Sequence, residues 1–150
     1  MRRFSKIKKR IESLFAADIN LRVYCTVYHK PSYFSHNGKL EIPRLWVTLD
    51  KEIIFDWLKD FEKMTIQTSE DSCGQRPVYW CDISGITAFI QEYIETPVDE
   101  LIDKTFETDL FGFADILKAA DRRIGKKKLL LLLDKTQCQA AKMVIAKRTA

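Results

Sequence analysis

The residues of this sequence that could do chemistry are mainly basic, and the densest group lies in DRRIGKKKLLLLLD, residues 121–134. Arginine and lysine side chains bind the phosphates of nucleic acids and release their counterions. The same residues also suit a corner between two helices. Arg122 and Arg123 would lie in the last turn of one helix, Gly125 would be its left-handed end, and Lys126–Lys128 would open the next. We interpret the segment as such a corner.

The corner does not by itself explain the three lysines. Lysines in the first turn of a helix meet the positive end of its dipole, at a cost of a few tenths to about 1 kcal/mol each. Either acids of the same chain or an external anion should therefore neutralise them. The run Leu129–Leu133 behind them is apolar on every side of a helix, which predicts that this short helix is buried.

Two histidines and four cysteines are the residues that could bind metal or act as nucleophiles. His29 with His36, and Cys73 with Cys81, supply the atoms for zinc, but neither spacing matches a structural site. Cys25 and His29 stand about 13 Å apart on a predicted strand, too far for a thiol–imidazole contact. The scattered glycines form no phosphate-binding loop motif. The sequence predicts no catalytic residue, metal or cofactor, and it leans against an enzyme.

Pairs of acidic residues stand at helical spacing. Carboxylates on one face of a helix repel each other, so we expect a lysine or arginine of the same chain beside each pair. A glycosidase-type pair of catalytic carboxylates is the alternative. The pairs are Asp56 and Asp60, Glu92 and Glu95, and Asp99 and Asp103.

Charge is segregated along the chain, within a net charge of +4. Residues 1–10 carry six Lys and Arg and no acid. Residues 50–115 hold sixteen acids against five basic residues, a local net of −11, whereas residues 116–150 hold ten basic residues against two Asp, a local net of +8. Blocks of opposite sign attract each other. We therefore expect the basic termini to fold back onto the acidic middle and to be largely neutralised by it.

The composition is that of a soluble globular protein. The 150 residues are 46% hydrophobic and 31% charged, which is enough for a single α+β domain over residues 1–150 without a metal or disulfide. The N-terminus has no apolar core of signal-peptide length, and no stretch approaches the ~18–20 apolar residues of a membrane span. The cysteines form no Cys-x-x-Cys pair. A reducing cytoplasm, with no membrane contact, is the expected location.

The elements that must position these residues begin with a helix and a sheet. Apolar residues at spacings of three and four predict a helix near residues 4–15, with Ser5 as its N-cap. Alternation predicts a strand over Leu21–Tyr28 and a hairpin in PRLWVTLDKEIIFDWLKDF, residues 43–61, that turns at Asp50 and Lys51. In that turn Lys51 would need a positive φ, which costs roughly 1 kcal/mol.

From residue 78 the pattern becomes helical. One helix runs to about residue 94, Thr96 caps the next, and a third covers residues 108–123 with Gly112 inside it. The last helical stretch, from residue 126 to about residue 147, breaks near Asp134 or continues as one helix. The sequence thus predicts an α+β fold: an N-terminal helix, a short antiparallel sheet of three to four strands, and three to five C-terminal helices packed on it.

Three motifs resemble those of one protein family. They are FSKIK at Phe4–Lys8, the hairpin WVTLDKEIIF at Trp46–Phe55, and DRRIGKKKL at Asp121–Leu129. The chain resembles a family of small uncharacterised bacterial proteins with an N-terminal aromatic-Ser-Lys-aliphatic-Lys motif, a Trp-containing hairpin and a C-terminal Asp-Arg-Arg-aliphatic-Gly-basic motif. That family has a glycine where this chain has Lys51. The resemblance implies an α+β fold and a bacterial cytosolic protein, and it implies no activity.

Two functions follow from these observations. Segregated charge, aromatic strand residues and the lack of a convergent catalytic set favour a cytoplasmic, non-catalytic protein-interaction module with an unknown protein partner, in an immunity-like or adaptor role. The alternative is a nucleic-acid-binding protein that uses the basic N-terminal helix and Arg122–Lys128, with strand aromatics stacked on bases. The candidate binding residues are Arg122, Arg123, Lys126, Lys127, Lys128, Lys6, Lys9 and Trp46.

Overall fold

The computed structural model of the chain describes residues 4–31, 39–57, 83–106 and 112–150. Its first elements are helix α1 (Phe4–Glu12) and the strands β1 (Leu21–Pro31), β2 (Lys39–Leu49) and β3 (Glu52–Asp56). The helices α3 (Ile83–Glu95), α4 (Val98–Leu101), α5 (Phe113–Ala120), α6 (Lys126–Lys135) and α7 (Gln139–Thr149) follow. The three strands form one antiparallel sheet in the order β1-β2-β3, so the fold is α+β, as the sequence predicts.

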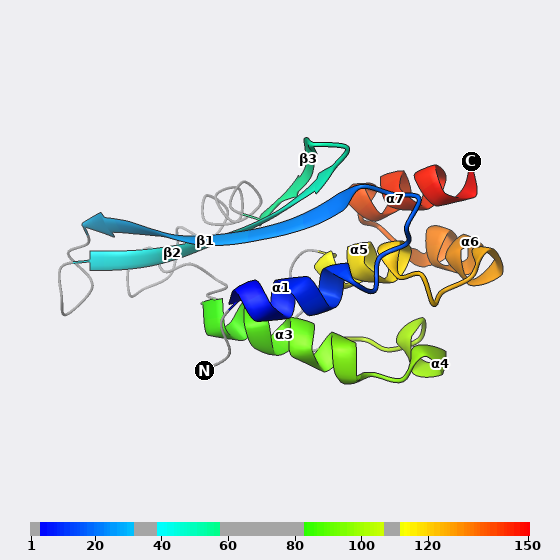
Figure 1. The fold of residues 1–150 in the computed structure, drawn as a ribbon, viewed down its shortest axis with the longest axis horizontal. Coiled ribbons are helices and arrows are strands. Elements are labelled where there is room, and N and C mark those ends of the chain that lie inside the picture. Colours follow the sequence, from blue (N-terminus) through cyan, green and yellow to red (C-terminus); the bar gives the residue numbers. More distant parts are fainter. Residues whose placement is uncertain (1–3, 32–38, 58–82, 107–111) are drawn as a thin grey trace, which may run out of the picture.

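The helices cover one face of the long sheet, as Figure 1 shows. α1 and α3 pack together along it, whereas α6 and α7 gather beyond α5, at the end where β2 turns into β3. Alternate strand residues, among them Val23 and Val47, are buried against this helical layer. Phe55 of β3 meets Phe113 of α5, with ring centroids 6.1 Å apart. The core is therefore formed between one sheet and one layer of helices.

Helix α1 also binds the outer edge of β1. The backbone N–H of Val23 donates to Glu12 at 3.0 Å, and the amine of Lys8 donates to the carbonyl of Val23 at 2.6 Å. Backbone groups on an edge strand otherwise invite pairing with another chain, so these two side chains occupy the edge at Val23. The helix already includes Phe4, which corrects the prediction of Ser5 as its N-cap.

The predicted turn at Asp50 and Lys51 joins β2 to β3. Both residues have positive φ, 51° and 72°, which confirms the strained backbone expected at Lys51. Two left-handed central residues are typical of a type I′ turn, whose twist matches that of the strands. The backbone N–H of Asp50 donates to the carbonyl of Asn20 at 2.9 Å, and its carboxylate pairs with Lys147 of α7 at 3.0 Å. The turn is thus tied to the residue that precedes β1 and to the C-terminal helix α7.

Two predicted helix starts are wrong. Thr96 does not cap α4, because its hydroxyl donates instead to the carbonyl of Glu92 in the last turn of α3, at 2.7 Å. Gly112 does not lie inside α5 but precedes it as the N-cap, with a φ of 90°. A left-handed residue cannot continue a right-handed helix, so α5 begins only at Phe113.

The corner at residues 121–125 also differs from its prediction. α5 ends at Ala120, so Arg122 and Arg123 follow the helix instead of forming its last turn. Gly125 is extended, with φ −81° and ψ 170°, and is the N-cap of α6. The helix stops early because the chain pairs with the segment between α1 and β1: the backbone N–H of Arg122 donates to the carbonyl of Leu14 at 2.8 Å.

Gly112 provides a test of how tightly α5 packs against the start of α7. An added Cβ would lie 2.8 Å from the Cβ of Cys138, on a backbone whose φ disfavours any side chain. We expect Gly112→Ala to lower the free energy of unfolding by at least about 2 kcal/mol, measured by urea denaturation. Gly125→Ala is the control, since nothing lies within 4 Å of its added Cβ, and it should cost less than about 1 kcal/mol. Equal losses in the two variants would contradict this packing.

Candidate functional site

The corner between α5 and α6 is organised around one buried carboxylate. Asp121 is 0% exposed. The hydroxyl of Tyr93 on α3 donates to its Oδ2 at 2.8 Å, and Arg123 donates to both oxygens, at 2.7 Å and 3.0 Å. The backbone N–H of Arg123 adds a further hydrogen bond to Oδ1 at 3.0 Å. A buried charge is stable only when it is paired and hydrogen-bonded, and Asp121 has both kinds of partner.

Main-chain contacts hold the same corner from two further sides. Asp121 forms an isolated antiparallel bridge with Phe15, at the segment between α1 and β1. Arg148 of α7 donates to three carbonyls of the corner, those of Ala119, Asp121 and Ile124, at 2.9, 2.9 and 3.1 Å. Carbonyls at a helix end lack donors within the helix, and the guanidinium supplies them. The corner is therefore fixed to α3, to α7 and to the N-terminal segment.

Protonation at the corner is stable around neutral pH. Burial, and then the charge of Asp121, raise the pKa of Tyr93 well above its usual value. Hydrogen bonds to Asp121 likewise raise the pKa of Arg123. Because Tyr93 and Arg123 both keep their protons, they remain hydrogen-bond donors to Asp121 and the cluster acts as a structural lock.

The corner separates the predicted basic residues into two kinds. Arg123 is bound by Asp121 at 2.7 Å, and its side chain is 30% exposed. Arg122 and Lys126–Lys128 are exposed, and no ion pair among the described residues includes any of them. Of the predicted binding residues at the corner, Arg123 thus has a structural partner, whereas Arg122 and Lys126–Lys128 stay candidates for binding.

The acidic middle neutralises only part of the basic C-terminal region. Lys135 pairs with Asp103 at 3.4 Å, and Lys147 pairs with Asp50 at 3.0 Å. Another acid of the middle, Glu92, pairs with Lys104 of the same block at 3.2 Å. A cation expected beside each acidic pair is therefore present at Glu92 and at Asp103. Arg44 is the corresponding cation at Asp56, and Asp60 lies outside the described residues. The expected neutralisation does not extend to Lys126–Lys128 within the described part of the chain.

Helix α6 exposes apolar side chains beside these lysines. Leu129 and Leu132 are buried, but Leu130, Leu131 and Leu133 are 51%, 50% and 36% exposed. The helix packs against α5 and α7 on one side only, so its apolar residues on the other side remain in contact with solvent. The expectation that the whole leucine run is buried is wrong. The sequence does not distinguish a buried helix from one with an apolar outer surface, because both are apolar on every side.

The remaining predicted residues lie elsewhere. Lys6 and Lys9 are exposed on α1, which occupies a different part of the helical layer from α6 (Figure 1). Trp46 lies in β2 between the inward-facing Leu45 and Val47, and it therefore points to the opposite, outer face of the sheet.

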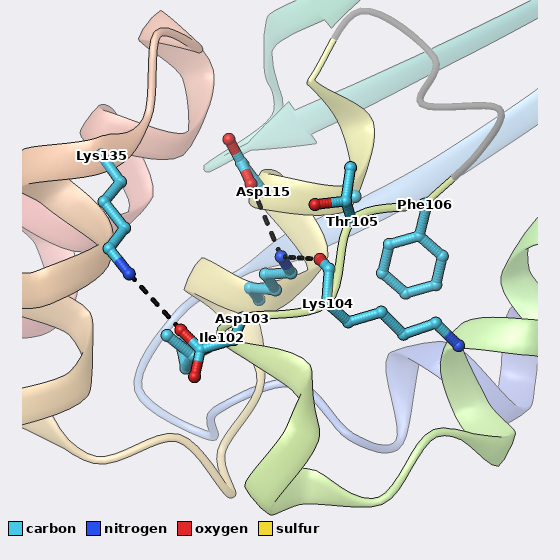
Figure 2. Close-up of a pocket in the computed structure, with 9 residues that line it drawn as sticks. Ile102, Asp103, Lys104, Thr105, Phe106, Asp115 and Lys135 are labelled. Carbon is cyan, nitrogen blue, oxygen red and sulfur yellow. Dashed lines mark hydrogen bonds and ion pairs between the residues drawn. The ribbon is translucent and has the colours of Figure 1, made fainter.

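A pocket of about 240 Å³ opens between the segment 102–106, α5 and the end of α6 (Figure 2). The amine of Lys118 lies between the carboxylate of Asp115, at 4.0 Å, and the carbonyl of Lys104, at 2.9 Å. Lys135 reaches Asp103 across the opening, and Asp115 also accepts a hydrogen bond from Thr136 at 2.6 Å. These charged groups are engaged with one another, so they tie α5 to the segment 102–106 and to the end of α6.

Most of the candidate metal ligands and nucleophiles lie outside the described residues. They are His36, Cys73, Cys81 and the side chain of His29. Over the described ranges no group of three or more His, Cys, Asp or Glu side chains could hold a metal ion. Within those ranges, too, every helix is too short or too polar to cross a membrane.

Tyr93→Phe tests the lock at Asp121. Loss of the hydroxyl removes one donor from a buried carboxylate, so the free energy of unfolding at neutral pH should fall by about 1.5–3 kcal/mol. The raised pKa of Tyr93 means that its protonated form favours folding. This contribution is complete below the ordinary tyrosine pKa of about 10 and is lost as the pH rises above it.

The stability gap between the wild type and Tyr93→Phe should therefore shrink above about pH 10, measured by urea denaturation between about pH 7 and pH 11. Tyr24→Phe, on the outer face of the sheet, serves as the control and should leave the interactions of Asp121 intact. A gap that stays constant across this range, or a neutral-pH loss no larger than that of Tyr24→Phe, would contradict the lock.

Comparison with known proteins finds a family match that covers the N-terminal part of the chain. A model of the SF0329 protein family matches residues 3–81, a range that includes Phe4–Lys8 and Trp46–Phe55 but not Asp121–Leu129. No curated protein and no solved structure matches the chain. Because the match covers more than half of the residues, the chain belongs to the SF0329 protein family.

Proposed function

We propose that the protein is a non-catalytic interaction module that docks a partner protein on α6. The observation that carries this proposal is the outer surface of the helix, where Leu130, Leu131 and Leu133 are exposed next to Lys126–Lys128. Exposed apolar surface rimmed by charge marks interaction sites in soluble proteins. An adaptor or an immunity-like protein acts in this way, by binding without chemistry.

The chemistry of α6 specifies its partner. Lys126, Leu130 and Leu133 follow one another at spacings of four and three residues, so they form one stripe along the helix. Lys127 and Leu131 form a parallel stripe by the same spacing. An amphipathic segment with leucine-like residues and Asp or Glu beside them would cover the apolar side chains and pair with the lysines. The partner we propose is therefore an acidic, amphipathic segment of another protein.

Other occupants fit this surface less well. A second copy of α6 offers one acid, Asp134, against three lysines, so it could not neutralise them. A nucleic acid would place the leucines against phosphates or base edges, where they make no hydrogen bonds.

We place this module in the reducing cytoplasm of a bacterium. The resemblance of its motifs and the absence of paired cysteine spacing support that location. The nucleic-acid alternative, on Arg122, Lys126–Lys128 and the basic residues of α1, is supported by the exposure of these cations. It remains the second candidate, because the leucines have no role in it.

A peptide titration tests the proposal. The probe is a labelled helical peptide with leucines on one side and glutamates on the other, and its partner peptide has glutamine in place of glutamate. The protein should bind the acidic peptide more tightly, as measured by fluorescence anisotropy. The triple change Lys126→Glu, Lys127→Glu and Lys128→Glu should weaken binding about tenfold or more, since three charge contacts are lost. Leu130→Ser combined with Leu131→Ser should also weaken it.

Two variants control for nonspecific effects. Lys9→Glu reverses an exposed charge on α1, and Met143→Ser removes an apolar side chain that is 49% exposed on α7. Both should bind the acidic peptide as the wild type does. Equal binding of the acidic and amide peptides, or equal losses in controls and α6 variants, would refute the proposal. Binding of a DNA duplex that depends on α6, without peptide binding, would replace it with the nucleic-acid alternative.

A further inference from the structure

The outer face of the sheet carries a row of aromatic and cationic side chains. Tyr24 and Trp46 are direct partners on β1 and β2, and their rings stack with centroids 5.3 Å apart. The amine of Lys8 lies 4.1 Å from the centre of the Tyr24 ring, and the guanidinium of Arg44 lies 4.5 Å from that of Trp46. Each ring thus has an aromatic neighbour and a cation, an arrangement that stabilises both.

Ion pairs hold this row in place. Arg44 donates to both oxygens of Asp56, at 2.7 Å and 3.2 Å, and Lys8 pairs with Glu12 at 3.2 Å. Aromatic side chains fixed from both ends lose little conformational freedom when a ligand arrives. The row is therefore a preorganised wall on the open side of the sheet.

A recess of about 600 Å³ lies against this wall and extends to the β2–β3 turn. Its size falls in the range of small-molecule sites. Two cations line it: Arg22, whose side chain is 55% exposed and lies 3.6 Å from Glu12, and Lys51 of the left-handed turn. Asn20 and Thr48 add polar groups, and no Asp or Glu is among its described lining residues. The recess is therefore suited to an anion.

The apolar part of the recess indicates what the anion is attached to. Ile53 is 54% exposed and lines the recess together with the rings of Tyr24 and Trp46. A flat aromatic group would contact both. Nucleotides combine a flat base with a phosphate, the group that arginine and lysine bind best. We propose that this recess binds a nucleotide, with Arg22 and Lys51 on the phosphate and Trp46 and Ile53 against the base.

An acidic peptide fits the recess less well. A bound peptide gains much of its affinity by pairing its main chain with an open strand edge. The recess lies on the face of the sheet, where the strands are paired with one another, and the neighbouring edge at Val23 is occupied by Lys8 and Glu12. This site is separate from α6 and does not depend on the function proposed there.

Binding of a labelled single-stranded oligothymidylate, followed by fluorescence anisotropy, tests the proposal. The double variant Arg22→Ala and Lys51→Asn should weaken binding at least tenfold; asparagine is chosen because it tolerates a positive φ. The slope of log affinity against log salt should fall by about 1.4, since each lost phosphate contact contributes about 0.7. The change in tryptophan fluorescence on binding should be lost in Trp46→Phe.

Competition with ATP distinguishes the two sources of the nucleotide. Displacement of the oligonucleotide by ATP identifies a free nucleotide as a ligand. Binding of the oligonucleotide without displacement by ATP identifies a nucleotide within a strand. Both outcomes support the site. Lys9→Ala and the triple lysine variant of α6 are the controls and should bind as the wild type does. The proposal is overturned if neither ligand binds at about 50 mM salt. It is also overturned if binding depends on Lys126–Lys128 and not on Arg22 and Lys51.

Discussion

Four parts of the chain meet at Asp121. Its carboxylate binds Tyr93 of α3 and Arg123 of the corner itself. Its main chain pairs with Phe15 of the N-terminal segment and accepts a hydrogen bond from Arg148 of α7. A buried carboxylate is tolerated only with a full set of donors, so its position dictates theirs. Because the corner cannot swing away from α3 without losing the hydrogen bond of Tyr93 to this buried charge, the direction in which α6 leaves it is set. The outer surface of α6 is a consequence of that constraint.

Positive charge in this protein divides between structure and surface. Three cations bind groups inside the chain. Lys8 holds the edge strand β1, Arg44 holds the aromatic row, and Lys118 holds the pocket beside α5. Lys126–Lys128 have no such contacts among the described residues, and they sit at the end of a helix whose dipole is already positive. The unfavourable interaction of these lysines with the helix dipole is not compensated by a carboxylate in that part of the chain. This is why we propose an acidic partner.

Local patterns in the sequence predicted much of the fold. Alternation located the strands, and the positive φ of Lys51 follows from the two-residue turn that the flanking strands require. What the sequence could not provide depends on distant contacts. The end of α5 is set by pairing with Leu14, and Gly125 is extended because that pairing comes before it. The exposure of Leu130 depends on how many neighbours surround α6, which periodicity does not encode, and the role of Asp121 depends on Tyr93, twenty-eight residues earlier.

The most direct test of α6 as a docking surface is site-specific photo-crosslinking in living cells. A photoreactive amino acid at Leu130 should form a covalent adduct with a partner whose crosslinked peptide, identified by mass spectrometry, is acidic and amphipathic. The same adduct should be absent with the crosslinker at Met143, and it should disappear when Lys126–Lys128 are changed to glutamate. Adducts only with other copies of this chain, or adducts of equal yield from both positions, would contradict the account.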